Sequence, residues 1–178
     1  MEFKSGLQHC FFVILIGLIL SVVAEGGIAQ DSAVPDGEPL YMTRCASCHQ
    51  ANGEGISGVF PPLNEVDWVT GDKGRLIRLV LDGVMGPLQV GDMVYTGAMP
   101  PWKTFLNDQE MAALLTYIRT AWDNDASAVT ENEVRLVREA TNDRKKAWTT
   151  EELEDEINQG IPGSFGFIIS PRDTTGTN

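Results

Sequence analysis

Two cysteines and a histidine stand within five residues of one another, in the run Cys-Ala-Ser-Cys-His that begins at Cys45. A C-x-x-C-H run is the attachment sequence of c-type haem, because its thiols form thioether bonds with the porphyrin and its histidine binds the iron. The chain's other histidine and cysteine, His9 and Cys10, lie in the N-terminal leader described below. The run therefore predicts one covalently bound haem c, attached through Cys45 and Cys48, with His49 as the proximal iron ligand.

Other uses of this run fit the rest of the sequence less well. A structural zinc site needs a second pair of ligands, commonly Cys or His, and neither residue type occurs after His49. A thioredoxin-like redox pair needs a strand followed by a helix, and this setting is absent. A disulfide between Cys45 and Cys48 would close a strained loop and leave His49 without a role.

The first 29 residues have the pattern of a secretory signal peptide. Lys4 precedes an apolar run at 11–23, and small residues at 27–29 stand before a cleavage site ahead of Gln30. The apolar run is shorter than the roughly 20 residues that a membrane span needs. Because Glu2 offsets Lys4, an uncleaved inner-membrane anchor facing the periplasm is the alternative. We expect a periplasmic protein, attached to the membrane only if the leader is retained.

The acidic composition limits the kinds of partner. The formal net charge is −12, and nucleic-acid binding calls for a basic surface instead. We therefore expect no nucleic-acid partner. An acidic surface can steer encounters with a basic patch on a partner protein.

Apolar periodicity and capping signals predict a helical protein. Asp72, Asn107 and Thr130 stand at helix N-termini, and Glu110 follows Asn107 at the capping-box spacing. Residues 84–102 are rich in glycine and proline, which favours a loop with a short extended piece at 89–94. The predicted helices cover 38–48, 73–82, 108–122 and 131–141, with an acidic helical segment at 151–159. The predicted divisions are a signal peptide (1–29), a flexible lead-in (30–37), a core domain (38–122) and a C-terminal extension (123–178) of short helices and a loose tail.

For the second axial position of the iron, the sequence leaves three possibilities, namely a methionine, a lysine or an open site. His49 is the only histidine after the leader, so a second histidine ligand from the mature monomer is excluded. Met42 lies too close to Cys45 to reach the far face, and Met111 belongs to the apolar stripe of its helix. The remaining candidates are Met85, Met93 and Met99. Prolines at 100 and 101 restrain the backbone after Met99, but core packing explains a methionine at this position about equally well.

The chain resembles the monohaem class I cytochromes c of bacteria, the small His/Met electron carriers. The resemblance runs from about residue 37 to residue 122. It rests on the helix that carries the C-x-x-C-H run, the segments Gly-Glu-Gly at 53–55, Phe-Pro-Pro-Leu at 60–63 and Gly-Ala-Met-Pro-Pro-Trp at 97–102, and the helices at 75–83 and 108–122. It implies an all-α class I cytochrome c fold, in which three to four core helices surround one haem c.

The resemblance also implies roles for individual residues. It makes Met99 the distal iron ligand, and it makes the carbonyl of Pro61 or Pro62 the acceptor for the Nδ1–H of His49. Such a bond orients the imidazole and raises its basicity. Trp68, Trp102 and Arg75 are candidates for the propionate edge of the haem, although packing explains the tryptophans equally well.

A one-electron shuttle is the function that these expectations favour. A His/Met-ligated iron has no open site for a substrate, so we expect no enzymatic activity. The expected partners are a dehydrogenase donor and an oxidase or other acceptor. The alternatives are a docking subunit of a quinoprotein dehydrogenase or terminal oxidase, which would use residues 124–178, and a haem enzyme or gas sensor with a displaceable Met99.

Haem removal should unfold much of the chain, because haem supplies a large part of the core in a protein so rich in loops. We expect the double variant Cys45→Ala and Cys48→Ala to be partly unfolded. Thermal melting followed by circular dichroism checks this. Cooperative melting of the apoprotein like that of the holoprotein would contradict the expectation.

Overall fold

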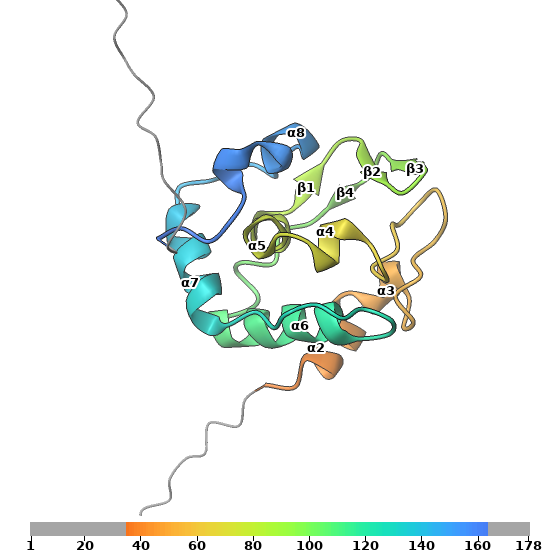
Figure 1. Cartoon of the computed structure of the whole chain (residues 1–178), viewed down its shortest axis with the longest axis horizontal. Helices are drawn as coiled ribbons and strands as arrows, with labels where there is room; N and C mark the ends of the chain where they lie inside the picture. The colour runs from red at the N-terminus through yellow and green to blue at the C-terminus, as the bar shows by residue number, and fades with distance from the viewer. Residues whose placement is uncertain (1–34, 164–178) are drawn as a thin grey trace, which may run out of the picture. The chain divides into compact units, whose positions relative to one another are not determined.

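The computed structural model describes residues 35–163 (Figure 1). The expected leader and the tail beyond residue 163 lie outside the described residues. Helices dominate, and no helix between residues 35 and 163 has the length and apolar character needed to cross a membrane. The helices are α2 (Gly37–Arg44), α3 (Ala46–His49), α4 (Asp67–Thr70), α5 (Lys73–Asp82), α6 (Asp108–Thr120), α7 (Glu131–Ala140) and α8 (Thr150–Glu154), followed by the 3₁₀ helix η1 (Glu156–Asn158).

The helix expected at 38–48 is divided at Cys45. Asp36 caps α2 by accepting a hydrogen bond from the backbone N–H of Glu38 at 3.1 Å. Cys45 has φ of −117°, far from the helical value near −63°, although its N–H still bonds to the carbonyl of Tyr41 at 2.8 Å. A separate short helix, α3, follows Cys45 and carries His49.

Helix α6 packs against α2 (Figure 1), and Gly37 of α2 lies against Ala113 of α6. A Cβ on Gly37 would clash with the carbonyl oxygen of Ala113, so only glycine allows this close approach. The expected capping box forms, because Asn107 and Glu110 exchange two side-chain-to-backbone bonds of 2.9 Å each. The helix ends two residues before the predicted boundary, because Ala121 is already extended, with φ of −82° and ψ of 160°.

Helix α5 lies at the centre of the fold (Figure 1), and its predicted bounds are those observed. Asp72 caps it through the N–H of Arg75 at 2.7 Å, and Gly83 ends it with φ of 77°. Nine of its ten residues are buried, because α4, α7 and α8 all pack against it. Three of the buried residues, Arg75, Arg78 and Asp82, are charged, and each bonds to a group of another segment.

The expected loop at 84–102 contains two small antiparallel sheets. Strand β1 (Val84–Met85) pairs with β4 (Ala98–Met99), and Val84 lies opposite Met99. Strand β2 (Leu88–Val90) pairs with β3 (Met93–Tyr95). The extended piece expected at 89–94 is therefore a hairpin. Strands of two or three residues are too short to show a reliable alternation in sequence.

The C-terminal extension shares its core with the rest of the molecule. Thr130 and Glu133 form a capping box at the start of α7, and Thr149 and Glu152 form another at α8. One connected cluster contains apolar side chains of α5 and α6 together with Val134, Val137, Trp148, Leu153 and Ile161. The chain at the end of the described region is held as well, because the carbonyl of Gly160 accepts from Arg78 Nη1 at 2.9 Å.

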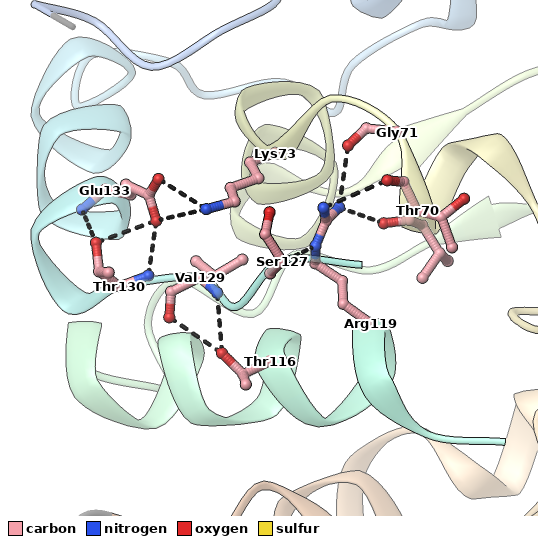
Figure 2. A network of polar contacts seen from close by, with 10 residues as sticks. Thr70, Gly71, Lys73, Thr116, Arg119, Ser127, Val129, Thr130 and Glu133 are labelled. Atoms are coloured by element: carbon pink, nitrogen blue, oxygen red, sulfur yellow. Dashed lines mark hydrogen bonds and ion pairs between the residues drawn. The ribbon is translucent and has the colours of Figure 1, made fainter. Parts of the chain in front are cut away.

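A buried arginine joins the linker between α6 and α7 to the end of α4 (Figure 2). Arg119 is 2% exposed. Its guanidinium donates to the carbonyls of Ser127 at 2.8 Å, Gly71 at 3.1 Å and Thr70 at 3.3 Å, and also to that of Val69. A cation at the C-terminus of a helix also interacts favourably with the helix dipole. The polar linker expected at 123–130 is thus tied to the core by a side chain of α6.

Arg119→Ala should lower the free energy of unfolding by about 3 kcal/mol, because it leaves several buried carbonyls without a donor. Chemical denaturation of the holoprotein measures this. Arg135→Ala is the matched control, since Arg135 lies on the exposed side of α7 in an i,i+4 pair with Glu139. That pair should contribute less than about 0.5 kcal/mol. Equal effects of the two substitutions would contradict the role of Arg119.

Candidate haem site

An apolar cavity lies between the C-x-x-C-H segment and the two hairpins. It holds about 1210 Å³ of empty space, part of which is open to solvent. Its walls come from α3, the loop at 60–63, α5, α6 and all four strands. Arg44, at the end of α2, is the only side chain with a formal charge among the residues that line it, apart from the titratable His49. Such a cavity suits a large, flat and mostly apolar ligand.

The imidazole of His49 is held in one orientation. Its Nδ1 lies 2.9 Å from the carbonyl oxygen of Pro61, an acceptor that requires the proton to be on Nδ1. Nε2 is then left to bind a metal. Burial lowers the pKa of His49, and the bond to Pro61 opposes this shift. Of the two prolines that the sequence points to, Pro61 supplies the carbonyl that accepts this bond. Both Pro61 and Pro62 line the cavity.

The backbone around residues 53–63 places Pro61. The N–H of Gly55 bonds to the carbonyl of His49 at 2.9 Å, and Leu63 donates to the carbonyl of Gly53 at 2.7 Å. Gly55 has φ of 63°, and a Cβ there would clash with the carbonyl oxygens of Phe60 and Pro61. The glycine therefore lets the loop fold back tightly enough to present the Pro61 carbonyl to the imidazole.

Both cysteines of the run line the same cavity as His49. Cys45 is buried, Cys48 is partly exposed, and both are free thiols. Burial raises the pKa of the Cys45 thiol to about 11, and the neighbouring Cys48 adds to the shift.

Among the methionines within residues 35–163, Met99 alone lines the cavity. It is half-buried in β4. The other two candidates from the sequence, Met85 and Met93, are 58% and 40% exposed. Met42 is exposed on α2, and Met111 is fully buried in the helical core. The structure thus brings the thioether of Met99 and the imidazole of His49 to one cavity, although they are 50 positions apart in sequence.

The three residues considered for the propionate edge lie differently. Trp68 and Trp102 line the cavity, and Arg75 stacks over the Trp68 ring at 4.5 Å to its centroid. Arg75 Nη2 bonds to the side chain and the carbonyl of Asp67, whereas its buried Nε has no hydrogen-bond partner among the described residues. The indole N–H of Trp68 donates to the carbonyl of Gln89 at 2.8 Å. Arg75 therefore reaches the cavity only indirectly, by packing against the Trp68 ring that lines it.

The donor set fits a haem better than a bare metal ion. Two thiols, one imidazole with a free Nε2 and one thioether line an apolar space with room for a porphyrin. Within residues 35–163, no group of three or more His, Cys, Asp and Glu side chains could hold a metal ion.

Sequence reasoning missed part of the cavity wall. Leu88, Val90 and Tyr95 form a small apolar cluster on the β2–β3 hairpin, and Trp68 packs against it. The only signal was the short alternation Leu-Gln-Val at 88–90. Helix α4, which carries Trp68, was also not predicted, because its four residues are too few for a periodic pattern.

Comparisons with known proteins show which family the chain is similar to. The family model for cytochrome c matches residues 34–122. A cytochrome c-552 of Thermus thermophilus is 38% identical over 130 residues, which cover 67% of this chain and 84% of the relative. The cytochrome c subunit of the quinone alcohol dehydrogenase of Gluconobacter oxydans is 34% identical over 106 residues, 57% of this chain and 22% of that subunit. The cbb3-type oxidase subunit CcoP of Azospirillum brasilense is 29% identical over 93 residues, 49% of this chain and 28% of the subunit.

Gly55→Ala should destabilise the protein more than Gly91→Ala, although both glycines have positive φ. Both substitutions incur the cost of about 1–2 kcal/mol for a side chain in the left-handed region. Nothing lies within 4 Å of a Cβ on Gly91, whereas a Cβ on Gly55 clashes with backbone. We expect an additional loss of about 1–3 kcal/mol for Gly55→Ala, measured by guanidinium unfolding. Similar losses for the two variants would contradict the tight loop described above.

Proposed function

Because this chain belongs to the cytochrome c family and carries one covalently bound haem c, we propose that it is an exported electron carrier whose iron is bound by His49 and Met99. Electron transfer is the activity of the family, and the axial ligands are our assignment. The observation that carries the assignment is that His49, Met99 and both cysteines of the run line one apolar cavity.

Haem iron with an imidazole and a thioether as ligands supplies one-electron transfer, and the thioether raises the reduction potential. The protein's own residues set the conditions. Pro61 holds the imidazole of His49 and increases its basicity through the bond to Nδ1. The apolar walls would offer few hydrogen-bond partners to water beside the iron. Cys45 and Cys48 attach the group so that it is not lost between partners.

The protein is not an enzyme by itself under this proposal. Haem enzymes that activate peroxide or nitrite need an open distal position with polar groups around it. Here the residues that line the cavity include Met99 and one arginine, Arg44, but no second histidine. A thioether ligand would close the iron to small substrates. The same closure disfavours a gas sensor unless Met99 is displaced.

Redox proteins are the partners we propose. Two relatives of this domain are named as the cytochrome c subunits of a quinone alcohol dehydrogenase and of a gluconate 2-dehydrogenase, and a third is named as a subunit of a cbb3-type cytochrome c oxidase. Cytochromes of this sequence type thus work with both electron donors and electron acceptors. We propose a dehydrogenase as the donor and an oxidase as the acceptor for this chain, through transient docking of small area.

Export to the periplasm is the second part of the proposal. It is supported by the apolar run at 11–23, the small residues at 27–29 and the covalent mode of haem attachment. N-terminal sequencing of the exported protein tests it, with Gln30 as the expected first residue. A retained Met1 would indicate the membrane-anchored alternative.

Met99→Ala should open the iron. The variant should lose the weak long-wavelength absorption that methionine sulfur gives on ferric low-spin haem, and its reduced form should bind carbon monoxide readily. Met93→Ala is the matched control, because Met93 is exposed on the neighbouring β3 and should leave both properties unchanged. If Met99→Ala keeps the band, the ligand assignment is wrong, whatever the result for Met93→Ala.

A further inference from the structure

The C-terminal extension contacts the chain on both sides of Met99. Its described part, residues 123–163, follows α6 and returns over α5 toward the β1–β4 hairpin, where α8 lies near β1 (Figure 1). The contacts on each side involve hydrogen bonds to main-chain groups.

Before Met99, the extension pairs with β1, the strand that lies opposite β4. The N–H of Met85 donates to the carbonyl of Trp148 at 2.8 Å, and the N–H of Trp148 donates to the carbonyl of Gly83 at 2.9 Å. Thr150 Oγ1 donates to the carbonyl of Pro87 at 2.5 Å. Trp148 is itself buried, so its side chain anchors this parallel bridge in the core. The extension therefore supplies a third strand-like segment beside the pair that carries Met99.

After Met99, an arginine of α7 holds the segment that leads into α6. Arg138 Nη1 donates to the carbonyl of Lys103 at 2.6 Å, and Nη2 donates to the carbonyl of Leu106 at 2.8 Å. Its Nε pairs with Asp108 at 2.6 Å. The ammonium of Lys103 in turn donates to the carbonyl of Arg144 at 3.1 Å. Two donor groups of one guanidinium thus bind the chain between Met99 and α6, and the third binds Asp108, the first residue of α6.

We propose that the extension is a brace that restrains the departure of Met99 from the haem iron, with Arg138 and Thr150 as positioning residues. This proposal rests on the proposed function, in which Met99 is the axial ligand. Moving Met99 away from the cavity requires the segment 83–106 to shift, and the brace holds that segment at both ends. Hydrogen bonds from a charged donor are stronger than those between neutral groups, and the bonds of Arg138 to the carbonyls of Lys103 and Leu106 are partly buried.

The rate of cyanide binding to the ferric holoprotein, at saturating cyanide, measures how often Met99 leaves. Arg138→Ala should raise this limiting rate by at least about tenfold, because two carbonyls and a carboxylate lose their donor. Thr150→Val removes the other contact with little change of shape, and it should raise the rate severalfold. Arg135→Ala is the matched control on the exposed side of the same helix, and its rate should equal that of the wild type.

The denaturant dependence of the rate separates a local restraint from general destabilisation. Opening of the 83–106 segment exposes little surface, so the faster rates should depend weakly on low concentrations of urea. A dependence as steep as that of global unfolding would overturn the proposal. So would limiting rates for Arg138→Ala and Thr150→Val that equal the rate of Arg135→Ala.

Met99→Ala distinguishes failure of the brace from failure of the ligand assignment. This variant should bind cyanide without the slow step. If the wild type binds cyanide as fast as Met99→Ala, then Met99 is not the ligand, and both the assignment and the brace are wrong. If Met99→Ala alone is fast and the brace variants match the control, the ligand assignment stands and the brace is wrong.

Discussion

The haem is attached at one five-residue segment, which is too short to surround it. The rest of the chain must therefore supply the other walls of the haem cavity. Cys45, Cys48 and His49 all lie on or beside α3. These other walls must therefore come from residues far along the chain, and the pairing of β1 with β4 brings Met99 to the cavity. Helices α5 and α6 form the apolar back of the cavity. Each of these elements is positioned relative to the short segment that carries the thiols and the imidazole.

A fold with so many loops needs donors for main-chain carbonyls, and arginines of this protein supply them. Arg78 binds the carbonyl of Gly160, Arg119 binds those at the end of α4, and Arg138 binds the segment before α6. Each guanidinium joins segments that are distant in sequence. A buried cation stripped of such acceptors would be strongly destabilising, so these arginines also specify how the segments meet.

The parts of the fold that could be predicted are those with local signals. Asp72, Asn107 and Thr130 cap their helices as expected, because a capping side chain bonds to an N–H only two or three residues away. The division at Cys45, helix α4 and the pairing of β1 with β4 were missed, whereas the extended piece expected at 89–94 is part of the β2–β3 hairpin. Strand β1 also pairs with Trp148, more than 60 residues away, and no local pattern contains that information.

By itself, the sequence determined the cofactor, the family and the main helices, since each of these depends on residues that are close together in the chain. Only the tertiary structure decided which of Met85, Met93 and Met99 lies at the cavity, and which of Pro61 and Pro62 bonds to His49. It also decided that the C-terminal extension packs against the hairpin of Met99. The physical reason is that the walls of the cavity come from segments that are remote in sequence. The distances between these segments are set by close packing and hydrogen bonds across the whole fold, and not by any local pattern.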